Sequence, residues 1–344
     1  MGPGSDVLVA AIAAHARQES IRSHTDLDTA RGWFLEALAQ MLRALRSPGC
    51  TRLVRPVVPG AVMPGGARVP GTSFELDPVQ AAFCIGVMVG WREAGDTPVA
   101  VAHPAQNLGG ILSTADYLAR RSIMQGKAPP CLGDVLAWLL TAYEIQGLLT
   151  RTLDLERFAG DHTLLIRLAS AATVTAMLGG GTEQIGAAVA SAWLDGPTLC
   201  VQLDEHHTGP RVWAAADATS RGVRHALVTL CAQIPDGDGM DASECGLWDA
   251  VPEGKRSLGL RSFTAARVQK ARQAFGESVS EQVDAAIDEW FLPRQAQAVK
   301  AVLVAEPARL DALPVNELMA RLVTLAPRPK DNRQMELALH LPAP

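Results

Sequence analysis

The segment from Val79 to Trp91, VQAAFCIGVMVGW, constrains the fold most, because its apolar residues would point in every direction around a helix. Asp77 and Pro78 precede it, and these residue types are favoured at a helix cap and in a first helical turn. A helix that is apolar all round has to be buried on every side. Other helices are therefore expected to surround this one.

Helical periodicity recurs along most of the chain. We predict helices within 6–46, from Pro78 onward, and over 108–124, 133–149, 161–178, 182–194, 210–233, 267–290, 294–305 and 314–325. Residues 55–77 are dense in Pro and Gly and predict a long ordered loop or irregular ribbon. The glycines of LGGGTEQIG predict a C-terminal turn, with Thr182 as the next N-cap. Strands do not alternate with helices, so the predicted fold class is all-α.

Charge and cysteine usage narrow the classes of function. The net charge is −5, and the 31 Lys and Arg residues are scattered, which argues against a nucleic-acid surface or a basic membrane anchor. Neither a signal peptide nor a bilayer-spanning run is visible, so a cytoplasmic protein is expected. The six cysteines lack zinc spacing and are interpreted as buried free thiols.

Domain boundaries follow from the same patterns. Met1 to Ser5, MGPGS, is interpreted as a cloning remnant. Residues 6–326 are predicted to form a single helical domain, with an N-terminal part over 6–250, and 327–344 a loosely held tail.

Several motifs, in order along the chain, resemble the MmgE/PrpD family. They include CTRLVRPVVPGAVMPGGARVPGTSFELDPVQAAF, HPAQNLGGILSTADYLARR, LTAYEIQG, GDHTLLIRLASAA, WAAADATSRGVRHAL and LPRQAQAVKAVL. The resemblance implies a helical core with a smaller α/β lid, a homodimer, and an active site where lid meets core. It also implies lyase or isomerase chemistry on carboxylic acids, a small-molecule substrate, and neither metal nor cofactor.

One departure from the family concerns its lid. Where the resemblance places the lid, only Pro252 to about Arg272 separates the flanking motifs, and about twenty residues cannot bury a core of their own. We therefore predict an MmgE/PrpD-type helical core domain without the α/β lid. Residues 251–272 would be the scar of the deletion, followed by C-terminal helices over 273–326.

The second departure concerns the site. The resemblance assigns catalytic roles to His103, His162 and Asp96, and substrate contacts to Glu93, Thr97, Gln106, Asn107, Arg211 and Asp204. The family's His-Pro-Ser-Asp-Asn reads His-Pro-Ala-Gln-Asn here, so a hydroxyl and a carboxylate are gone. Asp204 and Glu205 stand where the family has basic residues.

Plainer interpretations of these residues stay open. His103, which precedes Pro104, could simply cap a helix, and His162 could be a hydrogen-bonding residue at a helix start. Glu93 and Asp96 could be solvated acids at a helix end. The adjacent pair His206 and His207 lacks a third placed ligand, so no metal site is predicted there.

Three functions remain in view. The first is a lyase or isomerase, dehydratase-like in its acid–base chemistry, acting on a small organic acid or specialised metabolite with fewer carboxylates than citrate. The second is an inactive homologue that serves as a scaffold or partner subunit. The third is a genuine dehydratase of 2-methylcitrate, the tricarboxylate used by members of the family.

Overall fold

The computed structural model of the chain describes residues 5–17, 24–91, 103–153, 163–195, 208–232 and 311–324. The first half of this part is built from α1 (Ser5–Arg17), α2 (His24–Ala44), α3 (Pro48–Leu53), β1 (Ala67–Arg68), β2 (Glu75–Leu76) and α4 (Pro78–Gly90). Then follow η1 (Pro104–Asn107), α5 (Leu108–Met124), α6 (Leu132–Thr152), α7 (Thr163–Met177), α8 (Thr182–Leu194), α9 (Thr208–Ala232) and α15 (Val315–Thr324).

The described part is therefore almost wholly helical, as predicted. Within it, strand structure is limited to one antiparallel pair of two residues, in which Ala67 faces Leu76 and Arg68 faces Glu75. This short ladder lies inside the predicted irregular ribbon. The predicted deletion scar and the helices at 267–290 and 294–305 lie outside the described residues.

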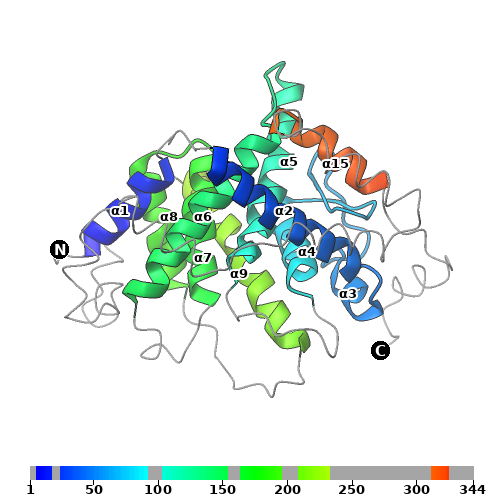
Figure 1. Cartoon of the computed structure of the whole chain (residues 1–344), viewed down its shortest axis with the longest axis horizontal. Helices are drawn as coiled ribbons and strands as arrows, with labels where there is room; N and C mark the ends of the chain where they lie inside the picture. The colour runs from blue at the N-terminus through cyan, green and yellow to red at the C-terminus, as the bar shows by residue number, and fades with distance from the viewer. Residues whose placement is uncertain are drawn as a thin grey trace.

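Helix α4 lies deep in the molecule, as its all-round apolar sequence predicts. Nine of its residues are buried, and the carboxylate of Asp77 accepts hydrogen bonds from the amides of Val79 and Gln80 at its N-terminus. In Figure 1, α2 runs across the front of the molecule, and its buried face contacts both α4 and α6. The apolar surface of α4 thus packs against other helices of the same chain.

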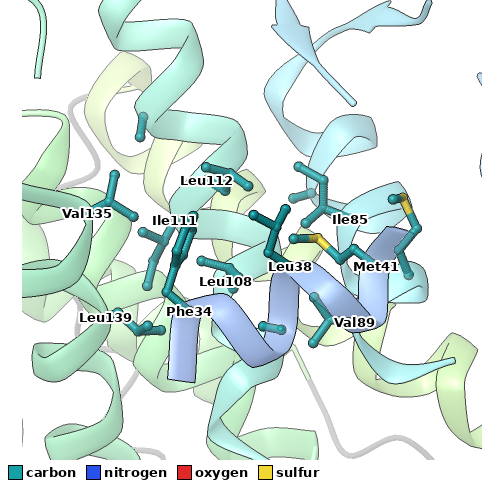
Figure 2. Close-up of a cluster of buried hydrophobic side chains, with 14 of the residues drawn as sticks. Phe34, Leu38, Met41, Ile85, Val89, Leu108, Ile111, Leu112, Val135 and Leu139 are labelled. Atoms are coloured by element: carbon teal, nitrogen blue, oxygen red, sulfur yellow. The ribbon is translucent and has the colours of Figure 1, made fainter. Parts of the chain in front are cut away.

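The main core lies where α4, α5 and α6 meet beneath α2. Figure 2 shows apolar side chains of α2 pointing toward residues of α4, α5 and α6. The labelled members are Phe34, Leu38, Met41, Ile85, Val89, Leu108, Ile111, Leu112, Val135 and Leu139. A second cluster joins α1 to α6, α7 and α8.

Close helix contacts surround the start of α5. A Cβ atom added to Gly109 would lie 2.7 Å from the carbonyl oxygen of Ala82, and one added to Gly86 would lie 2.9 Å from Cα of Ala216. Real Cβ atoms do not approach so closely, so glycine lets α4, α5 and α9 pack backbone to backbone here. This contact holds the first turn of α5, and η1 before it, against the centre of the molecule.

The ribbon and α15 are fixed to the outside of this core. The guanidinium of Arg68 forms an ion pair with the buried carboxylate of Asp116, at 2.5 Å, and donates to the carbonyl of Asn316. The amide of Gly71 donates to the carbonyl of Leu322. These bonds attach α15 to the ribbon and, through Asp116, to α5.

Two details differ from the sequence-based expectation. The N-cap of α8 is Gly181 rather than Thr182, and the side chain of Gln184 accepts a hydrogen bond from the Gly181 amide at 2.9 Å. The extended backbone of Gly181 begins the helix, so the cap needs no side-chain hydroxyl. The cysteines are not uniformly buried either: Cys50 and Cys84 are, but Cys131 is half-buried and Cys231 exposed.

Candidate functional site

His103 caps the turn η1. Its backbone is extended, with φ −68° and ψ 130°, and its Nδ1 atom accepts a hydrogen bond from the amide of Ala105 at 3.2 Å. The amide of Gln106 donates to the carbonyl of His103 at 3.0 Å. Pro104, in the first position, has no N–H to satisfy. His103 is thus an N-cap that acts through Nδ1, as the plainer interpretation of the sequence proposed.

An aromatic wall lies beside this histidine. The ring of His103 meets Tyr143 of α6 edge to face, with centroids 6.4 Å apart and planes at 87°. Tyr143 in turn stacks on Trp33 of α2 at 4.2 Å. Burial, with a smaller contribution from the charge of Glu36, raises the pKa of the Tyr143 hydroxyl above its usual range. Tyr143 therefore stays neutral and contributes a rigid, uncharged surface.

Asn107 closes the turn and is 0% exposed. Its Nδ2 group donates to the carbonyl of Pro104 at 3.0 Å and to Oε1 of Gln146 at 2.7 Å. Its Oδ1 atom accepts from the hydroxyl of Ser170 at 2.8 Å. The side-chain amide, to which the family resemblance assigns a substrate contact, is bonded to α6 and α7.

The same network continues into α9. Because Ser170 donates to Asn107, its oxygen accepts from the hydroxyl of Thr219, 2.9 Å away. The Thr219 oxygen accepts from the amide of Gly110 at 3.0 Å. A directed chain of hydrogen bonds thus runs from α5 through α9 and α7 back to η1. Such a fully bonded buried network rigidifies the groups it contains.

Gln106 is also buried, against the end of α4. A Cβ atom added to Gly90 would lie 2.4 Å from Nε2 of Gln106, so this side chain lies directly against the backbone of Gly90. The Oε1 atom of Gln106 is buried without a hydrogen-bond partner in the described part of the chain. This turn is therefore anchored to α4 as well as to α6, α7 and α9.

The remaining predicted site residues cannot be compared with this geometry. Glu93, Asp96, Thr97, His162 and Asp204 lie outside the described residues. Arg211 lies in the first turn of α9, but its side chain is not among those described. Their convergence on His103 stays a prediction.

Sequence reasoning missed Gln146, Ser170 and Thr219. Each is a buried polar residue. In α6 and α7, whose sequences are mostly apolar, such residues are a signal that could have singled out Gln146 and Ser170. It would not have identified their partners, because the Ser170–Asn107 bond joins residues 63 positions apart.

A second polar cluster joins the end of α8 to α9. Asp195 accepts from Nε of Arg221 at 2.5 Å and lies 3.0 Å from Nε2 of His225, whose Nδ1 lies 2.9 Å from the Ser191 hydroxyl. Although burial opposes it, hydrogen bonds from Arg221 and His225 lower the pKa of Asp195 to about 2.

Burial lowers the pKa of His225 by more than the neighbouring Asp195 carboxylate raises it, so this imidazole is neutral near pH 7. A neutral ring fits both contacts, since Ser191 can donate to Nδ1 while Nε2–H donates to Asp195. The order resembles a Ser-His-Asp relay, but Ser191 lies inside α8, where backbone amides serve the helix rather than an oxyanion. The cluster therefore secures the end of α8.

The described ranges contain no group of three or more His, Cys, Asp or Glu residues arranged to hold a metal ion. The same ranges contain no helix whose length and hydropathy would let it cross a membrane.

Comparison with known proteins gives a consistent picture. Residues 7–233 match the MmgE/PrpD N-terminal domain. The 2-methylcitrate dehydratase of Salmonella typhimurium is 42% identical over 256 residues, which cover 74% of this chain and 53% of that protein. The mitochondrial 2-methylcitrate dehydratase of Yarrowia lipolytica is 37% identical over 263 residues, covering 74% and 49%.

A third relative is the 2-methylcitrate dehydratase-like protein oryR of Aspergillus oryzae, which is 34% identical over 270 residues, covering 76% of this chain and 54% of that protein. The chain thus spans about half the length of the curated relatives it matches.

Proposed function

Because the chain belongs to the MmgE/PrpD family, we propose that it is a cofactor-independent lyase or isomerase acting on a small carboxylic acid. The observation that carries this proposal is the position of His103. The residue stands on a turn that four helices hold in place, with its ring against a neutral aromatic wall. Such a rigid setting is what a catalytic side chain requires.

Elimination next to a carboxylate needs three kinds of group. A base removes the carbon-bound proton, an acid protonates the departing hydroxyl, and cations or hydrogen-bond donors hold the carboxylate. In the proposal, His103 and His162 belong to the reacting centre together with Asp96, while Thr97, Gln106 and Arg211 contribute to binding. The names of the relatives, 2-methylcitrate dehydratases, support this class of reaction.

The charges near the predicted site favour a substrate with few carboxylates. Asp204 and Glu205 replace basic residues of the family, which leaves Arg211 to bind anions. Two unit charges about 4 Å apart interact by roughly 4 kcal/mol at an effective dielectric constant near 20. Two added acids would therefore weaken the binding of a citrate-like trianion by orders of magnitude.

Two alternative functions are each supported by one observation. The 42% identity to an enzyme named 2-methylcitrate dehydratase supports that activity itself. Exposed apolar side chains at Val57, Val58 and Val62 support a scaffold or partner subunit, because contiguous apolar surface marks protein contacts. The chain spans about half the length of the relatives, so neither alternative follows from the identity alone.

A comparison of substrates tests the proposal. The purified chain is incubated with 3-hydroxybutyrate, malate and 2-methylcitrate, which carry one, two and three carboxylates, and the unsaturated product is followed by its absorbance. We expect kcat/KM to be highest for one of the first two acids. Turnover of 2-methylcitrate at about 1 per second would establish the dehydratase instead. Absence of turnover and of calorimetric binding for all three would support the scaffold.

A further inference from the structure

We propose that the surface beneath α15 is a docking site for an amphipathic helical segment. Residues 311–324 occupy it as an internal ligand, and the same segment of a second copy of the chain can take their place. The site, here called the α15 cradle, consists of α5, Arg31, the ribbon at Arg68 and Gly71, and residues 130–132 before α6. In Figure 1, α15 lies at the upper right of the molecule, against α5. The inference concerns contact between chains and does not depend on the proposed function.

One face of α15 supplies the apolar contact. Its buried side chains occupy the first, fourth, fifth and eighth positions of the helix, and each is at most 1% exposed: Val315, Leu318, Met319 and Leu322. They belong to the same core cluster as apolar side chains of α5. A stripe with steps of three and four residues is how an amphipathic helix fills an apolar groove. Burial therefore determines which face of the segment docks.

The residues just before α15 bind as a short added strand. The amide of Val315 donates to the carbonyl of Pro130 at 3.0 Å, and the amide of Leu132 donates to the carbonyl of Leu313 at 2.9 Å. The two bonds flank an antiparallel bridge. Main-chain pairing of this kind is a second common mode of peptide recognition. It fixes the direction in which the segment enters the cradle.

A charged pair and further backbone bonds fix the register of the segment. Both carboxylate oxygens of Asp311 accept from Nη2 of Arg31, at 2.9 and 2.8 Å. Arg68 and Gly71 donate to backbone carbonyls farther along the helix, at 2.8 and 3.2 Å. These contacts extend from the first residue of the segment to the last turn of α15. A shift of one residue would break them together.

The anchors of the cradle are distant from α15 in the sequence. Those named above lie between residues 31 and 132, whereas the segment begins only after residues 233–310. The segment is therefore recognised by a folded surface, rather than held by a tight turn from a neighbouring helix. A surface that recognises a segment in this way can accept the same segment from another molecule, which is the basis of exchange between identical chains.

A cysteine trap tests this exchange on the wild-type chain. Cys131 faces Pro314 in the antiparallel bridge, between its two hydrogen bonds. Cα atoms of such a pair are about 4.5 Å apart, which suits a disulfide. A synthetic peptide of residues 308–326 that carries Pro314→Cys, activated as a mixed disulfide with thiopyridine, is added to the full chain. The Cys131 thiolate attacks the peptide sulfur, the new S–S bond forms, and thiopyridine leaves.

Mass spectrometry of proteolytic fragments measures the rate at which each cysteine is labelled. We expect Cys131 to react at least about tenfold faster with this peptide than with a scrambled peptide that bears the same cysteine. The exposed Cys231 should react equally with both. Adding Leu318→Asp to the peptide should abolish the preference, because it would bury a charge, whereas Glu317→Gln at an exposed position should preserve it. Equal labelling of Cys131 by the matching and scrambled peptides would overturn the proposal.

Two changes in the chain then test the cradle itself. Leu318→Asp in the full chain weakens the resident segment, so the matching peptide should label Cys131 faster than in the wild type. In that background, Arg31→Ala should slow the labelling about tenfold, since Asp311 of the peptide loses its charged partner. A folded Leu318→Asp chain with an unchanged rate would refute docking in the cradle. Should this change prevent folding, the trap on the wild-type chain decides the question alone.

Discussion

The hydroxyl of Ser170 in α7 donates to Oδ1 of Asn107 across 2.8 Å, and both residues are fully buried. Since the same amide donates to Gln146 of α6, one side chain joins η1 to two helices. The turn that carries His103 therefore depends on contacts remote in sequence.

Replacing Asn107 should destabilise the fold. Asn107→Ala leaves the Ser170 hydroxyl and the Gln146 carbonyl oxygen without this partner in a buried setting. Each unsatisfied buried polar group costs about 1–3 kcal/mol, so the free energy of unfolding should fall by at least this amount. Urea denaturation measures the change. Arg224→Ala, at an exposed position of α9, is the control and should shift it by less than about 0.5 kcal/mol.

A double-mutant cycle tests the bond itself. Ser170→Ala and Asn107→Ala should be less costly together than the sum of the two single changes, because each single change leaves the other group unsatisfied. Strict additivity would show that the two side chains are not coupled in solution.

A second stability prediction concerns the start of α4. The Asp77 carboxylate accepts from the amides of Val79 and Gln80, both at 3.0 Å. Asp77→Ala removes this cap and should lower the free energy of unfolding by about 1 kcal/mol. Asp77→Asn keeps an acceptor in the same place and should be nearly neutral. An equal loss of stability in both variants would mean that the negative charge of Asp77, rather than its capping hydrogen bonds, stabilises the helix.

Local signals predicted most of this fold. The segments 108–124 and 182–194 coincide with α5 and α8, because helical periodicity and glycine turns are local features. Asp77 was recognisable for the same reason. The β1–β2 ladder was missed, since strands of two residues are too short to show alternation.

The site was less predictable from the sequence than the helices. Whether His103 caps or catalyses depends on where Nδ1 points, which no spacing reveals. The bonds of Ser170 to Asn107 and Thr219 arise only when η1, α7 and α9 pack together. The family resemblance pointed to the turn at His103, but its contacts depend on how η1 packs against α6, α7 and α9.

Acid should weaken the junction between α8 and α9. Hydrogen bonds from Arg221 and His225 outweigh burial and lower the pKa of Asp195 to about 2, below the value of 3.8 for the isolated group. A carboxylate with a depressed pKa adds stability above its unfolded pKa, and this stability is lost as pH falls from about 4 toward 2. Asp195→Asn should therefore flatten the stability profile over this window, as measured by urea denaturation at each pH.

Protonation of His225 should also destabilise this junction, at a higher pH than protonation of Asp195. Burial lowers the pKa of His225 below the usual 6.5 of an imidazole, so the unfolded chain binds the proton more readily. The stability contributed by the neutral ring is complete above about pH 6.5 and decreases as pH falls through the folded pKa. In His225→Gln this part of the pH dependence should disappear, while the Asp195 window below pH 4 should remain. Loss of both windows would contradict separate contributions.

We expect a homodimer whose contact surface is the ribbon around Val57 and Val58, because α4 is buried within the chain. Val57 and Val58 are 78% and 65% exposed, and they help to line a groove of about 330 Å³ between the ribbon and the start of α4. Such an exposed apolar surface can pair with the same surface of a second copy across a two-fold axis. Light scattering at micromolar concentration should give twice 36.4 kDa.

The matched variants are Val58→Asp and Val228→Asp, the second at a position of α9 that is 45% exposed. Only Val58→Asp should shift the mass toward that of one chain. A monomeric wild-type protein would exclude the dimer, and an equal effect of both variants would exclude this surface.

The last prediction concerns substrate charge. By the family resemblance, Asp204 and Glu205 stand where the family has basic residues. A bound tricarboxylate would then have to offset the desolvation of three charges with Arg211 as the predicted cation. We therefore expect negligible dehydration of 2-methylcitrate or citrate at neutral pH. The double variant Asp204→Lys, Glu205→Lys should bind 2-methylcitrate at least about tenfold more tightly, since each reversed charge at about 4 Å is worth several kcal/mol before solvent screening. Isothermal titration calorimetry at low and high salt measures the gain, which should shrink as salt rises. Unchanged affinity in the double variant would show that these acids do not face the ligand.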